Sequence, residues 1–244
     1  MQERHENLTT PEGSMPTFVV HPDGDGPFPV ILFYMDAPAI REELYDMARR
    51  IAGEGYYVLL PDLFYRFGVI RFPVRTPKSS FIWRECMAHM SNANVMDDTR
   101  AMIALVDADP KARGGALGCI GFCMSGRLVT TAAGTFPDRV AAICSLYGVG
   151  IVTANEDSPH TLIKNFKAEC YYSFAETDGT VPSFVLPTLK AELEAHGIEH
   201  RIDVWPGTHH GFSFASRDIY HEEAAERCWD IFFDLCKRNL GRTH

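Results

Sequence analysis

Apolar residues follow two different patterns along this chain. Continuous apolar runs occupy residues 29–34, 56–60 and 116–120, and such runs are typical of strands buried on both faces of a parallel sheet. Residues 41–54 instead place apolar side chains three or four positions apart, which predicts an amphipathic helix. The further predicted strands are 17–20, 139–148, 170–175 and 199–205, and the further predicted helices are 91–107, 127–134, 181–196 and 218–239.

Strands that alternate with helices predict an α/β fold with a mostly parallel sheet and helices on both faces. We find no internal repeat and no linker, so we expect one domain over residues 1–244, without a separate cap domain. Residues 1–14 are polar and predict a loose N-terminal lead-in. Residues 63–90 mix aromatic and basic side chains without a clean period. They fit either a loop that lines a substrate pocket or a surface excursion packed by its own aromatic rings.

Composition and charge narrow the possible partners. The chain has 244 residues, of which 46% are hydrophobic and 23% charged, as in ordinary globular proteins. Its formal net charge of −9 disfavours nucleic acid and anionic membranes as main partners. Seven cysteines without a CxxC pair indicate free thiols in a reducing compartment. Because no apolar run reaches membrane-spanning length and the first residues lack an apolar signal region, we expect a cytoplasmic protein.

The stretch with the clearest chemical meaning follows the apolar run 116–120. It reads Gly121-Phe122-Cys123-Met124-Ser125-Gly126 and leads into a predicted helix. A strand, a tight turn of small residues and a helix form the setting of a nucleophile elbow. A thiol at the start of a helix meets backbone N–H groups and the positive end of the helix dipole, which favours its thiolate. A buried structural cysteine is the alternative for Cys123 taken alone.

Two further strand ends carry residues suited to the same chemistry. Asp178 follows the strand 170–175, and His210 follows the strand 199–205. The order nucleophile, acid, histidine is the order in α/β-hydrolases, and such groups gather beyond the carboxyl ends of parallel strands. In this arrangement Cys123 attacks a carbonyl carbon, His210 transfers the proton and Asp178 orients the imidazole. Taken alone, Asp178 fits a turn residue, and His209 competes with His210.

With these motifs the chain resembles the dienelactone hydrolase family of α/β-hydrolases over nearly its whole length after the first fifteen residues. The resemblance implies a catalytic triad of Cys123, His210 and Asp178, and the hydrolysis of an ester or enol lactone. It also favours His210 over His209. The other matching motifs are Val181-Pro182, Pro206-Gly207, Gly211-Phe212 and Tyr147-Gly148-Val149-Gly150.

The resemblance assigns further roles and also shows three departures. The fold implies an oxyanion hole made by the backbone N–H groups of Met124 and Ala37. Ser125 replaces the usual elbow glycine, and Asp36 stands where the family has a longer glutamate next to the thiol. Phe214 stands where members that bind dienelactone have an arginine, so we do not expect dienelactone itself as the substrate. The residues predicted for the substrate pocket are Tyr34, Trp83, Arg84, Tyr147, Phe212 and Phe214.

Two other functions remain open on the same fold. One is a thioesterase or acyltransferase that uses the same triad, and the other is a ligand-binding protein without catalysis. The histidines around residue 210 fit no common zinc spacing, and the glycines at 114–118 precede a strand instead of a helix, so we expect no metal and no cofactor. The expected partner is a small-molecule ester or lactone, and the expected state is a monomer or small homo-oligomer.

Overall fold

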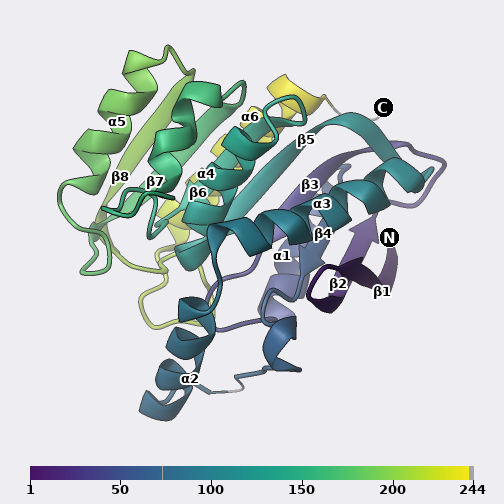
Figure 1. Ribbon diagram of the computed structural model, residues 1–244, viewed down its shortest axis with the longest axis horizontal. Helices are drawn as coiled ribbons and strands as arrows, with labels where there is room; N and C mark the ends of the chain where they lie inside the picture. Colours follow the sequence, from purple (N-terminus) through teal and green to yellow (C-terminus); the bar gives the residue numbers. More distant parts are fainter. Residues whose placement is uncertain (73, 242–244) are drawn as a thin grey trace. The chain divides into compact units, whose positions relative to one another are not determined.

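The computed structural model describes residues 1–72 and 74–241. These residues divide into one compact unit over residues 1–115 and a second over residues 116–241. Figure 1 labels their helices and strands. Within each unit strands alternate with helices, as the apolar pattern predicts. The organisation of the chain as a single domain stays a prediction.

The strands of the first unit follow the order β1-β2-β4-β3. Strands β3 and β4 are parallel and β2 is antiparallel to β4. Every residue of β3 and β4 is buried, as expected of their continuous apolar runs. Helix α1 places Leu44, Met47 and Ile51 on its buried side. The bounds are β1 Gln2–Thr10, β2 Gly13–His21, β3 Phe28–Tyr34, β4 Tyr57–Pro61, α1 Glu42–Gly53, α2 Pro77–Ala88 and α3 Asn92–Ala108.

The predicted loose lead-in over residues 1–14 is wrong. Residues 2–10 form β1, which pairs antiparallel with β2 from Gln2 opposite His21 to Thr10 opposite Gly13. The strand is polar because most of its side chains are exposed, and only Leu8 and Thr10 are buried. Backbone pairing with an apolar neighbour therefore sets the structure of this segment, and side-chain patterning reveals little of it.

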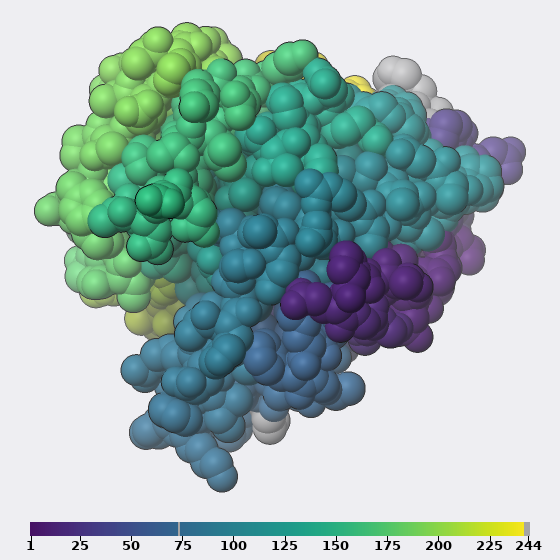
Figure 2. Space-filling model, viewed as in Figure 1, coloured from purple at the N-terminus to yellow at the C-terminus, as the bar shows by residue number. Residues whose placement is uncertain are grey.

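The segment 63–90 contains a short 3₁₀ helix, η1 (Tyr65–Phe67), and the helix α2. Helix α2 begins with a capping box in which Thr76 and Ser79 satisfy each other's backbone N–H groups, and Pro77 follows at the first helical position. Only Ser79 and Cys86 of this helix are buried, which explains why the sequence shows no apolar stripe. In Figure 2 the blue surface around α2 lies on the outside of the first unit.

The second unit holds strands in the order β5-β6-β7-β8, and all three neighbouring pairs are parallel. Helix α4 packs on β6, and α6 packs on β6 and β7. Figure 1 shows α4 in front of these strands and α6 behind them. The bounds are β5 Ala112–Phe122, β6 Val140–Leu146, β7 Glu169–Thr177, β8 His200–His209, α4 Gly126–Thr135, α5 Val185–Ala195 and α6 Glu222–Leu240.

The carboxyl ends of the parallel strands place the predicted chemistry at one edge of the second unit. Cys123 follows β5, Asp178 follows β7 and His210 follows β8. Strands β7 and β8 are direct neighbours, and their last paired residues are Thr177 and His209. The residues that come next, Asp178 and His210, therefore leave the sheet side by side.

Candidate active site

The turn around Cys123 is tight and strained. Cys123 has a φ of 55°, in a region that residues other than glycine rarely adopt. The turn also depends on the lack of side chains on both sides of it. A Cβ on Gly121 would lie 2.6 Å from the carbonyl oxygen of Ser125, and a Cβ on Gly126 would lie 2.3 Å from the Cα of Gly148. These close approaches are those expected of a nucleophile elbow.

Cys123 differs from the other six cysteines in exposure. All seven are free thiols, and Cys123 is partly exposed while the others are buried. Burial raises the pKa of Cys86, Cys144, Cys170 and Cys236, which disfavours their thiolates. Ser125, which replaces the usual elbow glycine, fits into the turn fully buried.

The side chains of Asp178 and His210 form a short hydrogen bond. The distance from His210 Nδ1 to Asp178 Oδ2 is 2.6 Å, and the carboxylate is almost completely shielded, with 5% side-chain exposure. Burial opposes ionisation of Asp178, but hydrogen bonds from His210 and Thr180 outweigh it and lower the pKa of this carboxyl. Asp178 is therefore a carboxylate that fixes which nitrogen of the ring carries the proton.

His210 connects this carboxylate to the thiol. Burial of the ring favours its neutral form, but hydrogen bonds to Asp178 and Cys123 outweigh burial and raise the pKa of His210 from 6.5 to about 9. Since Nδ1 is engaged with Asp178, Nε2 is the nitrogen left for Cys123. His210 is thus hydrogen-bonded to Asp178, and its pKa also responds to the nearby Cys123 thiol.

The surroundings of His210 fix the position of its ring and backbone. The ring of Tyr147 packs edge-on against it, with centroids 5.1 Å apart, and the Tyr147 hydroxyl is 2.6 Å from Ser213 Oγ. Arg217 donates a hydrogen bond from Nη1 to the His210 carbonyl at 2.7 Å. A Cβ on Gly211 would lie 1.6 Å from that Nη1, so the arginine occupies the space that a larger residue at 211 would need.

The neighbouring histidine does not share this setting. His209 is the last residue of β8 and is exposed, whereas His210 is partly buried. Successive residues of a strand point to opposite sides, and the hydrogen bond to Asp178 is made by His210. The geometry therefore agrees with the choice of His210 over His209.

Asp36 and Ala37 belong to the first unit, directly after β3. Asp36 is buried and bonded by Arg41, with 2.5 Å between Nη1 and Oδ1 and 3.3 Å between Nη2 and Oδ2. Arg41 in turn contacts Glu43 at 3.0 Å. The N–H of Ala37 has no hydrogen-bond acceptor within residues 1–72 and 74–241. The roles of Asp36 at the thiol and of Ala37 in an oxyanion hole stay predictions.

The residues predicted for the substrate pocket have different surroundings. Tyr147, Phe212 and Phe214 are buried in the second unit with at most 1% exposure. Tyr34 is buried in the first unit and its hydroxyl is 2.9 Å from Thr99 Oγ1. The other two lie on α2, where Trp83 packs edge-on against Phe72 and the exposed Arg84 donates to the Ser80 carbonyl. Contact of these six side chains with a substrate stays a prediction.

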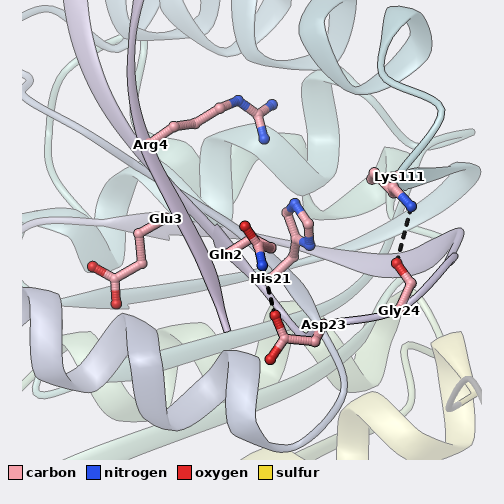
Figure 3. Close-up of a pocket in the computed structure, with 7 residues that line it drawn as sticks. All are labelled: Gln2, Glu3, Arg4, His21, Asp23, Gly24 and Lys111. Atoms are coloured by element: carbon pink, nitrogen blue, oxygen red, sulfur yellow. Dashed lines mark hydrogen bonds between the residues drawn. The ribbon is translucent and has the colours of Figure 1, made fainter.

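A cavity of about 470 Å³ lies in the first unit and is separate from these residues. Figure 3 shows its lining side chains and two of their hydrogen bonds, from Gln2 to Asp23 and from Lys111 to the carbonyl of Gly24. None of the residues predicted for the site lines this cavity. The residues that line it are Gln2, Glu3, Arg4, His21, Asp23, Gly24 and Lys111.

Comparison with known proteins shows to which family the chain belongs. The model of the dienelactone hydrolase family matches residues 15–240. This chain belongs to the dienelactone hydrolase family. It is 26% identical over 226 residues to a Synechocystis protein named "Putative carboxymethylenebutenolidase", a match that covers 91% of each chain. A protein of the same name from Methylorubrum extorquens is 29% identical over 221 residues, covering 89% of this chain and 75% of the relative. As a member of this family, the chain is a hydrolase.

Solved structures of the family have the same fold. A structure described as a putative dienelactone hydrolase from Klebsiella pneumoniae gives a TM-score of 0.85 at 23% identity, over 96% of this chain and 98% of its own. A dienelactone hydrolase-like promiscuous phosphotriesterase from metagenomic libraries gives 0.81 at 16% identity, over 98% and 99%. The predicted α/β-hydrolase fold is confirmed. No helix among the described residues combines the length and apolar character needed to span a membrane.

The sequence did not point to three residues that contact the predicted site residues. They are Arg41, which binds Asp36, Thr180, which binds Asp178, and Arg217, which binds the backbone of His210. Thr180 had a local signal, because a threonine two residues after an aspartate in a turn is placed to hydrogen-bond it. The two arginines had none, since a surface-type residue in a loop has many possible partners.

Proposed function

We propose that the chain is a cysteine-dependent hydrolase of carboxylic esters or lactones, with Cys123 as nucleophile, His210 as general acid and base, and Asp178 as the group that orients His210. One observation carries the proposal: at the ends of β5, β8 and β7, His210 is hydrogen-bonded to Asp178 through Nδ1, and it lies near enough to Cys123 for the thiol to raise the pKa of the ring. Membership of the dienelactone hydrolase family and the names of the curated relatives support the substrate class.

The chemistry begins with attack of the Cys123 sulfur on the acyl carbon. With a pKa of about 9, His210 carries a proton at neutral pH and balances the charge of a thiolate. The carbonyl oxygen becomes an oxyanion, which the N–H groups of Met124 and Ala37 stabilise in this proposal. Met124 is the second residue of a 3₁₀ turn, so its N–H has no acceptor inside that turn.

The acyl–oxygen bond then breaks, and His210 gives its proton to the departing alkoxide. The acyl group remains on Cys123 as a thioester. His210, now neutral, accepts a proton from water, and the resulting hydroxide attacks the thioester. Collapse of this second tetrahedral intermediate releases the carboxylic acid and returns the proton to the Cys123–His210 pair. For a lactone the alcohol and acid remain in one product molecule.

Substitution of the nucleophile tests the proposal. Cys123→Ala should abolish hydrolysis of an activated aryl ester, and Cys123→Ser should retain little activity because a hydroxyl is a much weaker acid than a thiol. Cys170→Ala is the matched control, since Cys170 is buried in β7, and it should keep wild-type turnover. Turnover that survives in Cys123→Ala would refute the assignment of the nucleophile.

A panel of substrates then defines the class. We expect turnover of aryl esters and small lactones. The panel also contains thioesters, an amine as acyl acceptor and an aryl phosphotriester, which test competing activities. Faster turnover of thioesters, or transfer of the acyl group to the amine, would favour the thioesterase or acyltransferase function instead. A Cys123 that reacts with an alkylating reagent no faster than the six buried thiols would favour ligand binding without catalysis.

A further inference from the structure

Thr180 lies two residues after Asp178 and contacts its carboxylate twice. The backbone N–H of Thr180 donates to Asp178 Oδ1 at 2.9 Å, and the Thr180 hydroxyl donates to the same oxygen at 2.6 Å. The other carboxylate oxygen, Oδ2, accepts from His210 Nδ1. Each oxygen of the carboxylate therefore has its own donors, and rotation about the Cβ–Cγ bond would break all three hydrogen bonds.

The same hydroxyl also reaches the imidazole. Thr180 Oγ1 is 3.1 Å from His210 Nδ1. Because the hydroxyl hydrogen points to Asp178 Oδ1, the oxygen presents its lone pairs to the Nδ1–H group. Nδ1–H thus has a main acceptor at 2.6 Å and a secondary acceptor at 3.1 Å. Carboxylate, hydroxyl and imidazole form a closed set of three groups.

We propose that Thr180 is a positioning residue of the active site: its hydroxyl holds the plane of the Asp178 carboxylate so that Oδ2 stays in line with His210 Nδ1. This inference rests on the proposed function, in which the imidazole must face Cys123 with a fixed tautomer. Thr180 acts through Asp178 and His210 and not on the substrate. Proton transfer depends on the alignment of the ring, so the effect belongs in the catalytic step and not in substrate binding.

Three substitutions separate the hydroxyl from the rest of the side chain. Thr180→Val keeps the branched shape and removes the hydroxyl, whereas Thr180→Ser keeps the hydroxyl and removes the methyl group. Thr177→Val is the matched control, because Thr177 is an exposed threonine three residues earlier whose hydroxyl makes no hydrogen bond among the described residues. Thr180 is itself exposed, so folding should tolerate valine, and Thr180→Ala provides a second hydroxyl-free variant.

We expect Thr180→Val and Thr180→Ala to lower kcat by about tenfold, the value of one hydrogen bond of ordinary strength, with little change in KM. Thr180→Ser and Thr177→Val should keep the wild-type kcat. An independent reading comes from the far-downfield proton NMR signal of the short Nδ1–H bond to Asp178. That signal should persist in Thr180→Ser and should weaken or disappear in the two variants without the hydroxyl.

The two readings distinguish failure of this inference from failure of the proposed function. If the wild-type protein hydrolyses no ester or lactone, or if Cys123→Ala stays active, the proposed function fails, and the NMR signal still reports whether Thr180 holds the carboxylate. If the wild type is active and Thr180→Val keeps both its kcat and its signal, the positioning role is overturned. A Thr180→Ser variant as impaired as Thr180→Val also overturns it, because the hydroxyl would then not be the group that matters.

Discussion

Replacement of Gly126 by alanine sets two physical effects against each other at the start of α4. Alanine is favoured over glycine inside a helix by about 1 kcal/mol, so propensity alone predicts a more stable protein. The structure predicts the opposite, because the added Cβ would lie 2.3 Å from the Cα of Gly148 and 2.7 Å from Ser145 Oγ. The nearest obstacle is backbone, and relief requires the first turn of α4 to move.

The expected net effect is a loss of about 2 kcal/mol. Overpacking of a close contact costs about 1–3 kcal/mol or more, and a separation of 2.3 Å places this site at the upper end before the gain in propensity is subtracted. For a chain of this length, such a loss lowers Tm by roughly 4–8 °C. Movement of the turn also displaces Cys123 relative to His210, and a displacement of about 1 Å lowers turnover on the order of 100-fold.

Urea unfolding at pH 7 and turnover of an aryl ester measure both effects. The matched control is Gly53→Ala at the end of α1, where a Cβ would meet nothing within 4 Å. That variant should be as stable as the wild type or slightly more stable. The reasoning fails if Gly126→Ala is as stable as Gly53→Ala and fully active.

Four further predictions concern ionised groups. Cys123→Ala should lower the pKa of His210 from about 9, because the thiol is one of the two groups that raise it; NMR titration of the ring checks this, and an unchanged pKa contradicts it. The charge of His210 should stabilise the folded state by at most about 3 kcal/mol. This stabilisation is complete below about pH 6.5 and is lost as the pH rises through about 9. Wild type and His210→Gln, unfolded in urea across this range, should therefore converge in stability at high pH. Asp178→Asn should reduce turnover on the order of 10³-fold, since an amide supports the wrong tautomer of the ring, and turnover within tenfold of wild type would contradict that orienting role. Asp36→Asn should cost about 3 kcal/mol because Arg41 loses its buried partner, and equal urea midpoints for variant and wild type would show that the pair adds no stability.

The fold could be predicted from the sequence wherever burial sets the pattern. Strands β3 and β4 are buried at every residue, and their continuous apolar runs show it directly. The elbow could be predicted too, because its glycines are required by contacts between neighbouring segments. The approach of Asp178 to His210 follows from the parallel pairing of β7 and β8, which the alternation of strands and helices suggests.

Features decided by a single polar contact could not be predicted. Asp36 was expected beside the thiol, but the sequence did not reveal its ion pair with Arg41. The hydroxyl of Thr180 joins Asp178 to His210, which are 32 residues apart; the sequence indicates its bond to Asp178 but not its contact with His210. Strand β1 could not be predicted for a related reason, because its structure comes from backbone pairing and not from the character of its side chains.

The edge position of β1 has a practical consequence for any shortened form of this protein. The family match begins at residue 15, so a chain trimmed to that point would lack β1 entirely. The N–H and C=O groups of β2 that now face β1 would become an open edge, and open edges recruit other chains as added strands. We therefore expect the trimmed protein to aggregate or self-associate more readily than the full chain, because the polar strand β1 covers the edge of β2.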